Sequence, residues 1–234
     1  FIASSPVSGH IEHFTDGMQG EGAGKLELKL ELPFAHLGKT RVAGAYQMTN
    51  NRLVVEPSLP PLEQVNGKLE FTEAGVNVPG ANAVFFGGPL AISGSTQRDG
   101  SIRIGLQGRV APDTVRRAGG PAWLTYVRGT ADWRGTLNVR KKTVDVVLES
   151  NLQGIASALP APFVKTAAES VAVRVERRFV SNDSDVVGLT IGDLISARLS
   201  RHTEGKRTVI DRGVVRLGGG AAAEPERDGI WISG

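Results

Sequence analysis

Regular alternation of apolar and polar residues is the feature that most constrains how this chain folds. In residues 25–32 leucine occupies every second position, and lysine or glutamate fills each position between. Because successive side chains of a β-strand point to opposite faces of a sheet, the pattern predicts a strand with one apolar face and one wet face. Such strands are typical of antiparallel sheets, whereas strands of parallel sheets are apolar on both faces.

The same pattern recurs in two later segments, so the chain carries three clear apolar stripes. Their residues are Leu26, Leu28, Leu30, Ile102, Ile104, Leu106, Val144, Val146 and Leu148. We expect at least two of these stripes to line one common apolar surface. The intervening charged residues, such as Lys25, Glu27, Lys29, Arg103 and Asp145, should then lie on wet faces.

A repeated strand, turn and returning strand indicates a meander of hairpins. The repeat begins at Val42-Ala-Gly44, Val65-Asn-Gly67 and Val127-Arg-Gly129, although any antiparallel sheet can produce such triplets by chance. We expect its turns at Asn50-Asn51, at 73–75 and at Arg134-Gly135, because Asn and Gly tolerate a positive φ. The 30 glycines and 12 prolines of the 234 residues also favour many short strands.

Helical signals are few, so the predicted fold is all-β, a large antiparallel meander with one or two short helices. Pro112–Arg117 is one candidate helix, with Asp113 in its first turn, and Thr166–Ser170 is another. We expect residues 1–217 to form the sheet. Residues 218–229 should be a flexible linker because they are rich in Gly and Ala, and residues 230–234 should begin a further strand.

Composition and motifs argue against enzymes, metal sites, cofactors and nucleic-acid binding. The chain has no cysteine, which excludes thiolate catalysis and Cys-ligated zinc, and its net charge of +3 is too small and too scattered for a nucleic-acid surface. Gly38-Lys39-Thr40 lacks the earlier glycine of a phosphate-binding loop, since position 33 is proline. His10 and His13 have no evident third ligand. No run of about 18 apolar residues occurs.

The segment from Ser150 to Val164 contains no charged residue and is interrupted by Pro160 and Pro162. Two prolines so close together exclude a central strand or a helix interior. Because an uncharged loop of this length would expose an apolar patch, we expect it to be kinked and largely covered.

The stretch from Ser150 to Lys165 also resembles a signature of the YhdP branch of the AsmA-like proteins. Other landmarks of that family follow in order along most of the chain; they are 24–33, 42–44, 62–76, 86–89 and 124–133. No single landmark is decisive, but their order and spacing together are specific.

This resemblance implies a fold and a function. The family is similar to bridge-like lipid transfer proteins, whose long sheet curls into an elongated apolar groove. Its members are anchored in the bacterial inner membrane, extend through the periplasm and move phospholipid toward the outer membrane, which supports the envelope barrier. We therefore expect an internal periplasmic segment, tethered to the inner membrane by the rest of the protein. Its partners would be phospholipid acyl chains, with both membranes reached through other parts.

The nine stripe residues are then the candidates for the lipid groove. The alternative is a closed β-sandwich that serves as a structural or protein-interaction module, in which the same stripes would form a core. Alternation alone does not separate the two, because both need one apolar face.

Overall fold

The computed structural model describes residues 19–31, 41–55, 59–140, 143–181, 183–205, 207–223 and 228–234. Most of these residues lie in strands, which confirms the all-β fold. The helices within this part are short: α1 (Pro112–Arg117), as predicted, and the 3-10 helix η3 (Ala122–Tyr126). The second predicted helix is wrong. Residues 166–170 form a turn in which the Thr166 N–H and hydroxyl both donate to the Glu169 carboxylate.

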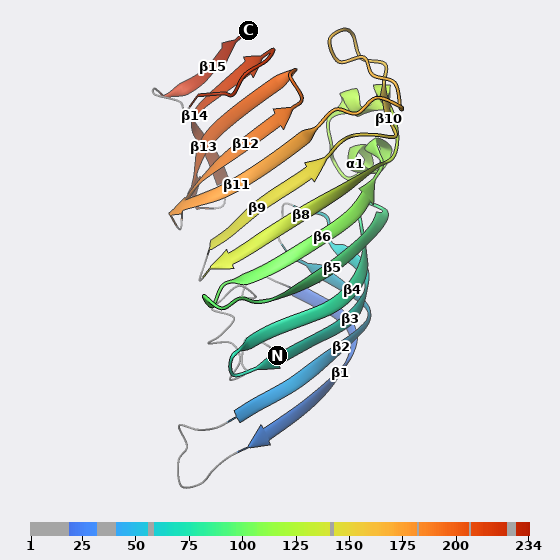
Figure 1. Cartoon of the computed structure of the whole chain (residues 1–234), viewed down its shortest axis with the longest axis vertical. Coiled ribbons are helices and arrows are strands. Elements are labelled where there is room, and N and C mark those ends of the chain that lie inside the picture. The colour runs from blue at the N-terminus through green and yellow to red at the C-terminus, as the bar shows by residue number, and fades with distance from the viewer. Residues whose placement is uncertain are drawn as a thin grey trace. The chain divides into compact units, whose positions relative to one another are not determined.

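The strands of the described part form one open sheet of thirteen strands and a small sheet of two (Figure 1). The large sheet has the order β1-β2-β3-β4-β5-β6-β8-β9-β11-β12-β13-β14-β15, and β7 pairs with β10. The pairing is mostly antiparallel, while β14 and β15 are parallel. The strand bounds are β1 (Gln19–Glu31), β2 (Arg41–Val54), β3 (Leu62–Thr72), β4 (Gly75–Phe85), β5 (Gly88–Thr96), β6 (Ile102–Val110), β7 (Val127–Gly129), β8 (Ala131–Arg140), β9 (Thr143–Ser150), β10 (Ile155–Ser157), β11 (Val173–Ser181), β12 (Ser184–Ile191), β13 (Ile195–Glu204), β14 (Arg207–Leu217) and β15 (Gly229–Ser233).

The chain divides into two compact units, which are described separately. Unit 1 comprises residues 1–108 and 138–142, and unit 2 comprises residues 109–137 and 143–234. Unit 1 therefore holds β1 to β5 and most of β6, and unit 2 holds β7, β9 to β15 and the two short helices.

Irregularities in the register cross four neighbouring strands of unit 1. The pairing shifts by one residue near Gly22 in β1, Asn50 in β2, Gln64 in β3 and Gly80 in β4. Gly22, Asn50 and Gln64 have positive φ values of 127°, 52° and 52°. A bulge bends its strand and moves the following side chains to the other face. The extra residue of each bulge lies in β2, β3 or β4, and Gly22 of β1 is the single residue opposite the bulge of β2. In β4 the apolar positions change parity across the bulge, from Val76 and Val78 to Ala81 and Ala83, so the apolar residues stay on one face.

Asparagine side chains replace ladder hydrogen bonds at these bulges. The Asn51 Oδ1 accepts from the Thr49 N–H at 2.8 Å, and the Asn66 Oδ1 accepts from the Asn50 N–H at 2.9 Å. Asn51 is itself buried. The predicted turn at Asn50-Asn51 is therefore wrong, because β2 continues through it as a bulged strand. The turn at residues 73–75 is confirmed and joins β3 to β4.

The turn predicted at Arg134-Gly135, in unit 2, is also wrong. Arg134 and Gly135 lie inside β8, and Gly135 is buried there. Residues 218–223 contain no strand or helix, and β15 follows at Gly229. The flexibility of 218–229 stays a prediction.

The proline-containing loop between β9 and β11 is anchored at its base by Lys165. This side chain is 9% exposed, and its Nζ donates to the carbonyls of Leu152, Ile155 and Thr166 at 2.9, 2.7 and 3.0 Å. Lys165 and Ser157 also exchange two backbone hydrogen bonds. The tip at 160–162 is exposed. The prediction of a largely covered loop therefore holds only around the buried Ile155 and Lys165, because Val164 is 63% exposed and residues 158 and 160–162 are also exposed.

Buried apolar side chains are scarce in the described part of the chain. They are Val65, Ala81, Ala83, Leu90, Ala131, Val139 and Ile155. Four of these lie on strands β3 to β5 of unit 1, and three of the seven are alanines, which fill little volume. Most larger apolar side chains are therefore only half-buried, as expected for a sheet face without a second packed layer.

Candidate functional site

One face of unit 1 is apolar from β1 to β6. Residues that are directly opposite on paired strands point to the same face, so the register identifies which side chains share it. Leu26 pairs with Tyr46, which pairs with Leu69. Further along, Val78 pairs with Gly94, which pairs with Ile104. The unit 1 apolar face thus comprises Leu26, Leu28, Leu30, Val42, Tyr46, Met48, Val65, Leu69, Phe71, Val76, Val78, Ala81, Ala83, Leu90, Ile92, Ile102, Ile104 and Leu106.

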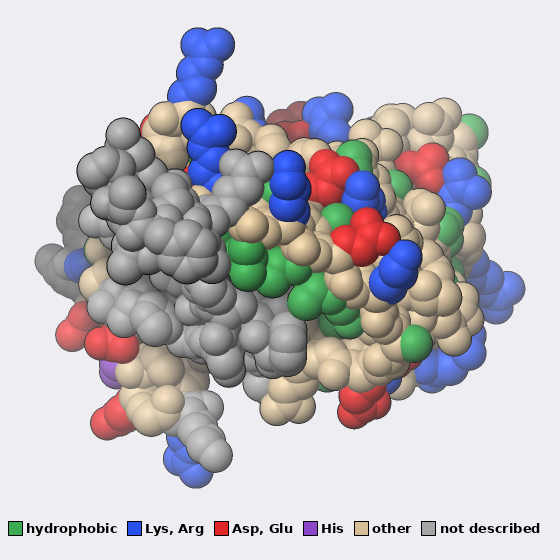
Figure 2. All heavy atoms as spheres, turned by 90° about the horizontal axis from the view of Figure 1, so that it is seen from below, with side chains coloured by type: hydrophobic (Ala, Val, Ile, Leu, Met, Phe, Trp, Pro, Cys, Tyr) green, Lys and Arg blue, Asp and Glu red, His purple; other side chains and the backbone are tan. Residues whose placement is uncertain are grey.

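This face is open to different degrees along its width. Leu26, Leu28 and Leu30 on β1 are 40%, 52% and 49% exposed, whereas Ile102, Ile104 and Leu106 on β6 are half-buried. Figure 2 shows hydrophobic side chains gathered at the surface beside charged ones. Exposed apolar surfaces of this kind are typical of ligand-binding grooves and of protein-interaction surfaces.

Glycines allow two aromatic rings to lie across the unit 1 apolar face. A Cβ on Gly44 would stand 2.4 Å from the Phe71 Cζ, and one on Gly24 would stand 2.1 Å from the Tyr46 hydroxyl. Both rings therefore cover backbone of the neighbouring strand.

The opposite face of unit 1 carries ion pairs between residues two apart on the same strand. On β1 the Lys25 Nζ lies 2.8 Å from the Glu27 Oε1, and on β3 the Lys68 Nζ lies 2.8 Å from the Glu70 Oε1. The hydrogen bond between Lys25 and Glu27 raises the pKa of the lysine and lowers the pKa of the glutamate. This face is therefore charged and wet.

Unit 2 has an apolar face of its own. Leu148 pairs with Val175, which pairs with Leu189, which pairs with Ala197 and then Val215. The unit 2 apolar face comprises these residues with Val144, Val146, Val173, Val187, Ile191, Ile195 and Leu199. Its side chains are half-buried. Thus six of the nine candidate residues share the unit 1 face, and Val144, Val146 and Leu148 lie on the unit 2 face.

A charged cluster lies on the unit 2 apolar face, near the hairpin that joins β11 to β12. Asp185 is buried and accepts from Arg201 Nε and Nη2 at 2.7 and 2.8 Å and from Arg177 Nε at 2.6 Å. The Arg177 guanidinium also lies 4.5 Å from the ring centre of Phe179. Burial raises the pKa of Asp185, but hydrogen bonds from Arg201 and Arg177 outweigh this, so its pKa lies below the ordinary value.

Sequence reasoning missed this cluster. Asp185 and the two arginines were visible only as scattered charges, because their meeting depends on the register of three strands. The one signal in the sequence was Arg177, which occupies an apolar position of the alternation between Val175 and Phe179.

No group of three or more His, Asp or Glu side chains that could hold a metal ion occurs among the residues described. His10, His13 and His36 lie outside that part of the chain.

Comparison with known proteins identifies the family. The family described as YhdP protein matches residues 1–234, the whole of the chain. The chain belongs to the YhdP family. Its similarity to a curated YhdP relative, "Intermembrane phospholipid transporter YhdP" of Escherichia coli (strain K12), is 23% identity over 230 residues. This alignment covers 92% of the chain and 17% of the relative, so the chain spans about a sixth of that YhdP protein. No solved structure matches the chain.

Within the described residues, every helix is too short or too polar to cross a membrane.

Proposed function

We propose that the chain is a periplasmic segment of a phospholipid transporter and binds acyl chains along its apolar sheet faces. The observation that carries this proposal is the unit 1 apolar face, where Leu26, Leu28 and Leu30 continue an apolar surface across six strands while remaining about half exposed. Its relative is named as an intermembrane phospholipid transporter, which supports the same function for this chain.

The energetics of acyl chains fit such a face. Each buried methylene contributes about 0.8 kcal/mol, so a chain of about sixteen carbons gains on the order of 10 kcal/mol before ordering costs. Contacts of this kind are non-directional and need no polar side chain to read the ligand. A lipid can therefore move along the face from one site to the next without breaking specific hydrogen bonds.

We further infer that the segment has no enzymatic activity and that the direction of movement is toward the outer membrane. The family relationship supports the first inference, because the relative's name describes transport. In the full-length protein, other parts would tether the segment to the inner membrane and reach the outer membrane.

A closed sandwich fits the described strands poorly. A sandwich consists of two sheets packed face to face, whereas all but two of the described strands belong to one sheet. A protein-interaction module remains the competing function, since a protein could also cover the open face.

Mass spectrometry of organic extracts tests the proposal. The chain is purified from the periplasm under detergent-free conditions, and its extract is compared with that of a periplasmic protein of similar size. We expect reproducible phospholipid in a fixed ratio to the chain. An extract no richer in phospholipid than the comparison protein would contradict the proposal and favour a protein partner.

A further inference from the structure

A partly open hollow lies on the polar side of unit 2, on the side of the sheet opposite the unit 2 apolar face. It is formed by β11, β12 and β13 and by residues Ala221 and Ala222, and its volume is about 140 Å³. A single water molecule needs only about 10–15 Å³ of such space. The hollow is therefore large enough for a small polyatomic group.

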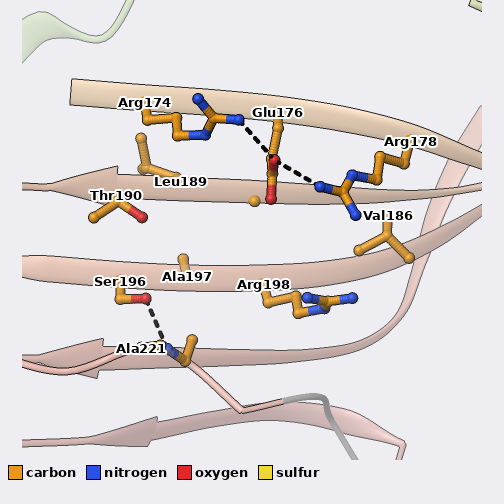
Figure 3. Close-up of a pocket in the computed structure, with 12 residues that line it drawn as sticks. Arg174, Glu176, Arg178, Val186, Leu189, Thr190, Ser196, Ala197, Arg198 and Ala221 are labelled. Atoms are coloured by element: carbon orange, nitrogen blue, oxygen red, sulfur yellow. Dashed lines mark hydrogen bonds and ion pairs between the residues drawn. The ribbon is translucent and has the colours of Figure 1, made fainter. Parts of the chain in front are cut away.

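The side chains around the hollow carry an excess of positive charge. Arg174, Arg178 and Arg198 line it together with one carboxylate, Glu176 (Figure 3). Glu149 and Arg134 add one charge of each sign, because Glu149 accepts hydrogen bonds from both Arg134 and Arg174. The whole group therefore keeps two positive charges in excess.

Glu176 holds its two arginines loosely. Its Oε2 lies 3.5 Å from Arg174 Nη2 and 3.3 Å from Arg178 Nη2. Charge-assisted hydrogen bonds of this type are usually about 2.7–2.9 Å long. The Arg178 guanidinium can therefore turn toward another anion at small cost, whereas Arg174 is also held by Glu149. Figure 3 shows Glu176 between the two arginines on β11, with Arg198 on β13 beyond β12.

Two hydroxyl groups and the segment at residues 219–222 also contribute to the hollow. Ser196 Oγ accepts from the Ala222 N–H at 2.7 Å, and the Gly219 carbonyl accepts from Arg216 Nε at 2.9 Å. These two bonds join the segment that forms one wall to β13 and β14. Because a hydroxyl both donates and accepts, Ser196 can still donate its own hydrogen, and Thr190 also lines the hollow.

We propose that this hollow binds a phosphate group. Guanidinium groups match phosphate oxygens through paired N–H donors, and the lining combines three guanidiniums with two hydroxyls. Phosphate presents more acceptor oxygens to such a set than a carboxylate does. The phosphate group belongs either to a phospholipid headgroup at a membrane surface or to a soluble phosphate ester. The site is separate from the acyl-chain surface and does not depend on it.

Titration of the purified chain with inorganic phosphate tests the site. Binding is followed by nuclear magnetic resonance of arginine side-chain N–H groups at constant ionic strength, with chloride as the replaced anion. We expect saturable shifts for arginines of the hollow. Arg178→Gln should weaken binding roughly tenfold, because it removes a charge-assisted donor from an exposed position that does not support the fold.

Of two further variants, one should tighten phosphate binding and the other should leave it unchanged. Glu176→Gln should tighten binding several-fold, because it removes the carboxylate that competes with phosphate for the same guanidiniums. Arg103→Gln changes an exposed arginine on the polar face of unit 1 and should leave binding unchanged. Absence of saturable binding, equal weakening by Arg103→Gln, or failure of Glu176→Gln to tighten binding would overturn the proposal.

Binding of two further ligands distinguishes a phospholipid headgroup from a soluble phosphate ester. Vesicles of phosphatidylcholine with phosphatidylglycerol present the group on a membrane, and glycerol phosphate presents it in solution. Binding of either ligand that Arg178→Gln weakens and Arg103→Gln does not would support the site and name its source. Insensitivity of both to Arg178→Gln would contradict it.

Discussion

Leu28→Asp separates an open acyl-chain surface from a closed core. Leu28 lies on β1 opposite Gly44 and is 52% exposed. Full burial of a leucine stabilises by about 1.5–3 kcal/mol, so the half-buried side chain contributes about 1 kcal/mol. The poorer strand propensity of aspartate adds up to about 1 kcal/mol. We therefore expect the free energy of unfolding to fall by about 1–2 kcal/mol, which lowers the melting temperature by about 2–8 °C.

The effect of Leu28→Asp on lipid should be much larger. A carboxylate that faces hydrocarbon loses hydration without a compensating partner, which costs several kcal/mol. We expect the phospholipid retained per chain to fall sharply while the protein stays folded. The assay pairs a thermal melt with mass spectrometry of the extracted lipid on the same preparation.

Ala43→Asp is the matched control. Ala43 pairs with Lys29 and is exposed on the polar face of β2, so the same carboxylate enters next to β1 but on the other side. It should leave retained lipid unchanged. The reasoning would be refuted if Leu28→Asp lowered the melting temperature by well over about 10 °C, as for a buried charge, or if Ala43→Asp removed lipid equally.

Three other substitutions, with Gly105→Val as a control for one of them, test internal contacts of the two units. Asp185 has a lowered pKa, so the stability that it contributes is present at neutral pH and is lost as the pH falls below about 4. In urea unfolding the parent should therefore lose more stability below about pH 4 than Asp185→Asn, which keeps only the losses of the other carboxylates; equal losses would contradict this role. Lys165→Met leaves three carbonyls without their donor, so the free energy of unfolding should fall by about 2–3 kcal/mol. Proteolysis within residues 158–165 should become faster, and an unchanged cleavage rate would count against Lys165 as the anchor of the loop. Gly44→Val drives a side chain into the Phe71 ring and should lower the free energy of unfolding by about 1–3 kcal/mol. Gly105→Val, whose Cβ would meet its nearest neighbour at 3.7 Å, should be tolerated. Equal melting temperatures for the two variants would refute the close approach of Phe71 to Gly44.

Alternation in the sequence predicts which side chains share a face of one strand, but it does not predict which strands are neighbours. The stripes at Leu28 and Ile104 could be seen in the sequence, whereas their common face depends on the pairings through β2 to β5. Asn50 shows a second limit. A positive φ at asparagine serves a turn and a bulge equally well, so the sequence favoured a hairpin where the strand continues.

Helix signals show the same dependence on context. Pro112–Arg117 has proline at its start, an acid in its first turn and arginines at its end, and it forms the predicted helix. Thr166 and Glu169 have the spacing of a helix start, but the segment remains a turn because too few residues follow before β11. The Arg-lined hollow of unit 2 was also beyond prediction, since it requires three strands and a distant segment.

Crosslinking along β1 in the full-length protein in cells tests the acyl-chain surface most directly. A photoreactive amino acid is placed in turn at each of positions 25–30, and lipid adducts are measured by mass spectrometry after illumination. We expect adducts at Leu26, Leu28 and Leu30 and none above background at Lys25, Glu27 and Lys29, because neighbouring residues point to opposite faces. Adducts without this alternation, or no lipid adduct at any of the six positions, would contradict an open lipid-binding face.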